Sequence, residues 1–354
     1  MFDGRSTTKS QNPMATLDHG LNTDTTMRSA LMEYISRLSK QVYTDFKPRF
    51  LESLSESNRQ LYTSLCKIPY AQKDWWRDQH DIIVARSMAK IIEGEAVRGN
   101  SSVPLWLISV ALIHDRGYGV LANLRSDNAE GYLSVGGAHW ENIDIRLRHS
   151  FLSRELAEVC LYGRFPEKLN VEPFATVGRC SPAVTEDEEE LFLEIVEKHD
   201  HPLIQKYEAL PALGRHHFDA DSLYSISLSS FVKDFLSYLG DEKKREQVLQ
   251  SGIFNSDTFS LRDLLLIRLS RYYAHASELP KDWPVETFPL NTRAVQLAEG
   301  CRCIVPHSET AKHLTDCAFN TLRVCVEEFE RALSVEAFTE WFSGALNSEM
   351  ERRF

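Results

Sequence analysis

Apolar residues recur every three or four positions along much of this chain, a spacing that places them on one face of an α-helix. The first such stretch covers residues 27–65. We expect Pro48 to divide it into two helices, because proline has no backbone N–H to donate. A second stretch covers residues 72–95. Few segments alternate with the period of two that a half-buried strand requires, so the pattern predicts an all-α fold.

The most hydrophobic helix expected from the sequence covers residues 105–115, which are apolar on nearly every side. Such a helix belongs in the centre of a fold. Pro104 suits its first turn, and Gly117 and Gly119 permit an abrupt end. We expect further helices over residues 145–161, from residue 186 onward, and over 219–239, 261–273, 291–297, 309–333 and 336–346.

These elements suggest four regions. Residues 1–26 are polar and are expected to form a disordered tail, and residues 27–71 form an N-terminal helical extension. Residues 72–240 would be the central helical domain, with loops over 124–143 and 165–185. Residues 241–354 would be a C-terminal helical region of undetermined role, which leaves homo-oligomerisation open.

Composition narrows the class of protein. Of 354 residues, 43% are hydrophobic, enough for a sizeable core. The net charge is −11, and the longest basic run is Lys243-Lys244-Arg245, which argues against nucleic acid as a partner. The most apolar window, residues 103–113, is too short to cross a bilayer. Seven scattered cysteines do not indicate a disulfide framework, so a soluble protein of the reducing cytoplasm is predicted.

The chemistry suggested by the sequence centres on histidines next to carboxylates. His114 and Asp115 end the most apolar helix, where an imidazole and a carboxylate are both costly to desolvate. A bound divalent cation removes both difficulties. Helical His80, His149 and His199 offer further nitrogen ligands. Mixed histidine and carboxylate ligands suit transition metals better than calcium.

In their order along the chain, these residues resemble the HD-domain superfamily of metal-dependent phosphohydrolases. The motifs are a helical His80, then Leu112-Ile113-His114-Asp115, then His149, His199 and an Ala220-Asp221-Ser222-Leu223 helix. The resemblance covers residues 72–240. It implies an HD-like helical bundle, here with N- and C-terminal helical extensions, that holds metal ions between its helices.

The resemblance also implies roles for individual residues. His80, His114, Asp115 and Asp221 would hold one divalent metal, and Asp115 would bridge to a second that His149 and His199 complete. Asp115 and His114 would then be the catalytic pair. One or two ions are expected, and Mn, Fe, Ni, Co, Zn and Mg are not distinguished.

Several positions have rivals. His139 competes with His149, His201 with His199, and Asp219 with Asp221. Members of the superfamily often carry a lysine soon after the His-Asp pair, where this chain has Arg116-Gly117-Tyr118-Gly119. A substrate phosphate could instead be held by Arg116, Lys198 or Arg148.

Other histidines and cysteines have ordinary explanations. His216 and His217 are expected to lie in a loop. The cluster Cys301, Cys303, His307, His313 and Cys317 lacks the paired spacing of structural zinc sites, and buried free thiols explain it more simply.

The leading functional hypothesis is hydrolysis of a nucleotide or another small phosphate ester by a metal-activated water. One alternative is an HD-type mixed-valent di-iron oxygenase, which the extra histidines and the missing lysine favour. A further alternative is a non-catalytic module that senses a nucleotide, although every ligand position here is filled.

Overall fold

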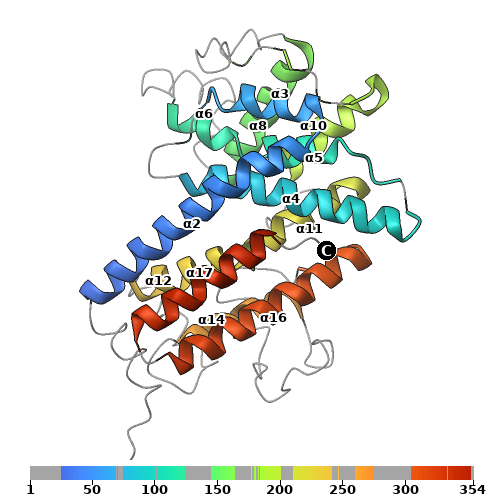
Figure 1. The fold of residues 1–354 in the computed structure, drawn as a ribbon. Coiled ribbons are helices and arrows are strands. Elements are labelled where there is room, and N and C mark those ends of the chain that lie inside the picture. Colours follow the sequence, from blue (N-terminus) through green and yellow to red (C-terminus); the bar gives the residue numbers. More distant parts are fainter. Residues whose placement is uncertain are drawn as a thin grey trace, which may run out of the picture. The chain divides into compact units, whose positions relative to one another are not determined.

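The described part of the chain is helical. A computed structural model describes residues 25–68, 70, 75–100, 102–123, 145–163, 177, 179–180, 182, 184–200, 210–240, 246, 260–273, 304–332 and 334–351. Figure 1 shows coiled ribbons and no strand arrows within these ranges. The predicted all-α class is therefore confirmed. Among the described helices, none is long and apolar enough to cross a membrane.

The described residues form two compact units. One comprises residues 1–42, 226–303 and 318–352, and the other residues 43–225, 304–317 and 353–354, in each case as far as they are described. The second unit starts earlier and ends earlier than the expected domain over residues 72–240, and it adds a short segment from the C-terminal region. All the candidate ligands that the structure describes lie in this second unit.

The first unit contains part of α2 (Thr25–Ser53), α12 (Leu228–Gly240), α14 (Leu261–Tyr272), most of α16 (Glu309–Arg331) and α17 (Val335–Glu351). Helix α12 packs against α14 and α17. In the core of this unit, the Phe329 ring packs edge to face against the rings of Phe235 and Phe338.

The second unit is built around α5 (Leu107–Ile113), whose residues are all buried. This helix contacts α3 (Glu56–Leu65), α4 (Trp75–Val97), α8 (Ile145–Tyr162), α10 (Glu189–Lys198) and α11 (Ala212–Ser225). The unit also contains α6 (Gly117–Asn123), the one-turn helix η3 (Glu186–Glu188), the end of α2 and the start of α16. The most apolar helix is thus central, as expected, because only a helix surrounded by others can bury every side.

The prediction that Pro48 separates two helices is wrong. Helix α2 continues through Pro48, and the break falls at Leu54–Ser55, where the Ser55 hydroxyl accepts the Asn58 N–H and starts α3. Phe46 and Phe50 on either side of the proline are buried and stacked on each other. Burial of this apolar stripe keeps the helix intact although one backbone hydrogen bond is lost.

The prediction of a single helix over residues 219–239 is also wrong. Helix α11 begins earlier, at Ala212, and ends at Ser225, and α12 begins at Leu228. The intervening Ile226 and Ser227 are buried. An apolar periodicity that continues across a short turn does not reveal the turn.

Candidate metal centre

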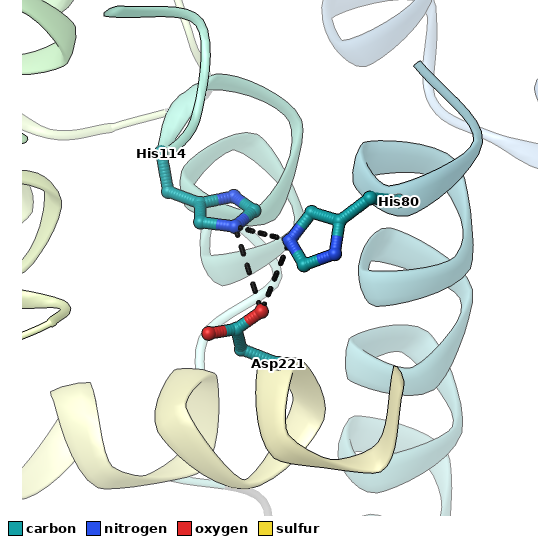
Figure 2. A group of neighbouring side chains, drawn as sticks. All are labelled: His80, His114 and Asp221. Atoms are coloured by element: carbon teal, nitrogen blue, oxygen red, sulfur yellow. Dashed lines mark hydrogen bonds and ion pairs between the residues drawn. The ribbon is translucent and has the colours of Figure 1, made fainter. Parts of the chain in front are cut away.

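The first candidate ligands come from three helices of the second unit. His80 lies in α4, His114 is the C-cap residue of α5, and Asp221 lies in α11. Helix α4 packs against both α5 and α11. Figure 2 shows the three side chains pointing toward one another from these helices. Residues that are 34 to 141 positions apart along the chain thus converge.

This first group is compact. The His80 Nε2 atom lies 3.0 Å from the His114 Nε2 atom and 3.0 Å from the Asp221 Oδ1 atom. The His114 Nε2 atom lies 3.7 Å from the same Asp221 oxygen. His114 is fully buried, and His80 is 9% exposed.

A second group contains His149 from α8 and His199, the C-cap residue of α10, with Asp200 directly after it. The two Nε2 atoms are 3.1 Å apart, and the His149 Nε2 atom lies 3.8 Å from the Asp200 Oδ2 atom. All three residues are buried. Asp200 is a candidate ligand that sequence reasoning missed, although its adjacency to His199 repeats the His114–Asp115 pattern.

Asp115 connects the two groups. Its Oδ1 atom lies 3.0 Å from the His149 Nε2 atom and 3.5 Å from the His199 Nε2 atom. Its Oδ2 atom lies 3.4 Å from the His80 Nε2 atom. The Oδ1 atom also lies 3.8 Å from the His114 Nε2 atom. One carboxylate thus lies within reach of imidazoles from both groups, as a bridging ligand must.

Backbone carbonyls fix the orientation of two imidazoles. The Nδ1 atom of His114 lies 2.9 Å from the Ala111 carbonyl oxygen, and the Nδ1 atom of His199 lies 2.7 Å from the Val196 carbonyl oxygen. A neutral imidazole that donates from Nδ1 has its lone pair on Nε2. Both lone pairs thus face the cluster, as in histidines that bind metals.

The spacing of the ligand atoms fits a transition metal. Metal–nitrogen bonds of about 2.0–2.1 Å place neighbouring ligand atoms about 2.8–3.0 Å apart in octahedral sites and about 3.3–3.4 Å apart in tetrahedral sites. The two imidazole pairs, at 3.0 and 3.1 Å, lie within or close to these separations. Two lone pairs that face each other at this distance repel unless a proton or a cation lies between them. The buried groups can therefore hold a metal ion.

The electrostatics of the cluster favour positive charge. Burial lowers the pKa of His114, but the Asp115 and Asp221 carboxylates outweigh burial and raise it to about 10. Burial raises the pKa of each of these carboxyls, but the neighbouring imidazoles hold both well below the usual range. Burial lowers the pKa of His149. The carboxylates thus remain charged and need compensation, from protonated imidazole or from a bound cation.

Close packing explains the glycine that follows Arg116. A Cβ atom added at Gly117 would lie 1.9 Å from the carbonyl oxygen of His149. The Gly117 N–H donates to the Ser153 hydroxyl at 2.8 Å, so α6 begins directly against α8. This contact sets the position of His149 relative to Asp115.

Arg116 lies inside the fold, in a setting that does not suit a substrate ligand. Its side chain is 2% exposed, its Nε atom is 2.9 Å from the Asp81 Oδ2 atom, and its Nη2 atom is 3.0 Å from the Asp78 Oδ1 atom. Its guanidinium carbon lies 4.6 Å from the Tyr70 ring centroid. Arg116 thus compensates two carboxylates of α4.

The other predicted basic groups have the following positions. The Lys198 ammonium lies 2.8 Å from a Glu194 carboxylate oxygen, one turn earlier in α10. Arg148 is half-buried in α8, one residue before His149. His139 and His201 lie outside the described residues.

The prediction that His216 and His217 lie in a loop is wrong, because both belong to α11. His217 is fully buried, and its ring centroid lies 4.7 Å from that of His114 and 6.0 Å from that of His199. His217 and Asp221 are four residues apart, which places them on one helix face. This spacing was the available signal, but it shows only when the start of α11 is known.

Asp219, the rival of Asp221, has a different role. Its two carboxylate oxygens accept the His307 backbone N–H at 3.0 and 2.8 Å, just before α16. Of the alternative cysteine cluster, Cys301 and Cys303 lie outside the described residues. The Cys317 Sγ atom lies 3.8 Å from the His313 Nε2 atom.

No protein-family model, curated protein or solved structure matches the chain. In the part of the chain that the structure describes, the fold is all-α, and Asp115 lies between two histidine–carboxylate groups.

Proposed function

We propose that this chain is a metal-dependent phosphohydrolase of the HD type that acts on a nucleotide or another small phosphate ester. The observation that carries the proposal is the pair of buried imidazole contacts on either side of Asp115, at 3.0 and 3.1 Å between Nε2 atoms. Two neighbouring divalent sites joined by a carboxylate are a frequent arrangement in phosphoester hydrolysis.

In this proposal the residues have distinct roles. His80, His114, Asp115 and Asp221 hold one cation; His149, His199 and Asp200 hold a second, to which Asp115 bridges. When bound, a divalent cation lowers the pKa of a water ligand and neutralises charge on the phosphoryl oxygens. Asp115 is the bridging ligand, and His114 keeps its Nε2 atom directed at the cluster through its bond to Ala111. Apart from Asp221, whose side chain is 17% exposed, these ligands are buried, which lowers the local dielectric constant and strengthens these interactions.

The test is hydrolysis of para-nitrophenyl phosphate by purified protein supplied with Mn²⁺, Co²⁺ or Ni²⁺. We expect turnover by the wild type and loss of at least about 1,000-fold in Asp115→Ala, because both metal sites lose their shared ligand. Circular dichroism should show an unchanged helical signal. Asp187→Ala removes an exposed carboxylate from η3 and serves as the matched control. Turnover that survives Asp115→Ala contradicts the proposal.

A second function is favoured by one observation, the complete second group of His149, His199 and Asp200. Two full nitrogen and oxygen ligand sets also suit a mixed-valent di-iron oxygenase. Elemental analysis of protein purified without added metal separates the two functions. Iron together with an O₂-dependent absorption spectrum supports the oxygenase, and a different metal with phosphoester turnover supports the hydrolase.

A further inference from the structure

A cation lies beside the bridging carboxylate. Arg77 precedes His80 by three residues in α4, so the two side chains lie on the same helix face. The Arg77 Nη1 atom lies 3.5 Å from the Asp115 Oδ2 atom. The side chain is 18% exposed, more than the 2% of Arg116. Arg77 is therefore partly exposed to solvent, to about the same extent as the Asp221 side chain at 17%.

An aromatic ring holds Arg77 in place. The guanidinium carbon lies 3.4 Å from the centroid of the Tyr118 ring. The His149 ring is stacked on the same tyrosine, with centroids 3.8 Å apart and planes 14° apart. Two groups this close to one ring must occupy its opposite faces. Tyr118 is thus layered between Arg77 and a candidate ligand, and stacking of this kind restricts the guanidinium plane.

The charges at this point favour an anion. Without metal, the Asp115 carboxylate compensates Arg77. Once two divalent cations share that carboxylate, the positive charge of the cations and the guanidinium exceeds the negative charge of the three carboxylates at the site. The remaining positive charge includes the Arg77 guanidinium, whose side chain is partly exposed to solvent. A planar guanidinium also matches the paired oxygens of a phosphoryl group, which a lysine ammonium does not.

We propose that Arg77, held by Tyr118, binds the anionic oxygens of a phosphoryl group at the metal centre. This proposal deepens the proposed function and rests on it for the identity of the metal-bound site. Arg77 thus takes the phosphate-binding role that the sequence suggested for Arg116. The cationic side chain that binds the substrate lies one turn before His80 and not directly after Asp115.

The experiment measures binding of inorganic phosphate to Mn²⁺-loaded full-length protein by isothermal titration calorimetry. We expect Arg77→Gln to weaken phosphate binding by about 10- to 100-fold, the effect of losing hydrogen bonds from a charged donor. Arg77→Lys keeps the charge but loses the paired geometry, so an intermediate loss is expected. Manganese content should be unchanged in both variants.

Arg86→Gln is the matched control. Arg86 also lies in α4, and its guanidinium carbon is 5.3 Å from the Phe46 ring centroid, so the substitution removes an equivalent arginine from the same helix. It should leave phosphate affinity unchanged. If Arg77→Gln does not fold, as judged by circular dichroism, Arg77→Lys decides the question alone.

Three results would overturn the proposal. These are absence of phosphate binding by the wild type, equal affinity in the wild type and the Arg77 variants, and loss of manganese from those variants. The last would make Arg77 a support of Asp115 only. Phosphate binding that depends on Arg77 in a protein that hydrolyses no phosphoester keeps the anion site and refutes the hydrolase, so the two failures are distinguishable.

Discussion

The substitution Gly117→Ala tests how the second group of ligands is positioned. A Cβ atom at residue 117 would lie 1.9 Å from the His149 carbonyl oxygen, 2.7 Å from its carbonyl carbon and 2.9 Å from its Cα atom. All three neighbours are backbone atoms, so no side-chain rotation relieves the clash. To reach ordinary contact at 3.4 Å, the start of α6 and α8 must separate by about 1.5 Å.

The expected cost is at the upper end of overpacking effects, about 3 kcal/mol or more. The same displacement moves the His149 imidazole away from the Asp115 oxygen that it now contacts at 3.0 Å. Metal ligation tolerates little displacement, so the second site should lose affinity while the first site keeps its ligands. Thermal unfolding followed by circular dichroism measures the first effect, and elemental analysis after equilibration with limiting Mn²⁺ measures the second.

Gly344→Ala is the control for this substitution. Gly344 is exposed within α17, and a Cβ atom there would meet nothing within 4 Å. The change should raise stability by about 0.5–1 kcal/mol, because alanine favours a helix over glycine. A Gly117→Ala protein that unfolds at the wild-type temperature and binds the wild-type amount of manganese would refute the reasoning about His149.

Two more predictions concern charges in the same unit. Burial, and after it the nearby Glu158 carboxylate, raises the pKa of Glu155 to about 7. The folded state therefore favours the protonated form. This contribution to stability is lost as pH rises from about 4 to 7. Glu155→Gln should therefore raise the unfolding temperature at pH 8 but not at pH 4, and an equal shift at both would contradict this. Arg116→Met leaves Asp81, which is fully buried, without its cation and should cost about 3–5 kcal/mol of stability in urea unfolding. The double variant Arg116→Met with Asp81→Asn should recover part of that loss, and no recovery would mean that the pairing does not matter.

The sequence by itself determined the features that depend on local periodicity. Residues 105–115 are apolar on nearly every side, which predicted a central helix, and His114 and Asp115 directly follow the buried helix Leu107–Ile113. The i, i+4 order of apolar residues likewise revealed most of α4, α8 and α16. Local pattern misled where the outcome depends on more distant packing. Pro48 stays within α2 because Phe46 and Phe50 are buried together, and the turn at Ile226 is invisible in a continuous apolar pattern.

Only the tertiary structure decided which polar groups meet. The adjacency of Asp200 to His199 is visible in the sequence. Its position beside His149, and that of His217 beside His114, is decided only when α10 and α11 pack against their neighbours. The same holds for the arginines. Arg116 is neutralised inside the fold by Asp78 and Asp81, whereas Arg77 of α4 pairs with Asp115. Helical periodicity is set within a few residues, but the partners of a charge are chosen by helix packing between segments far apart in the chain.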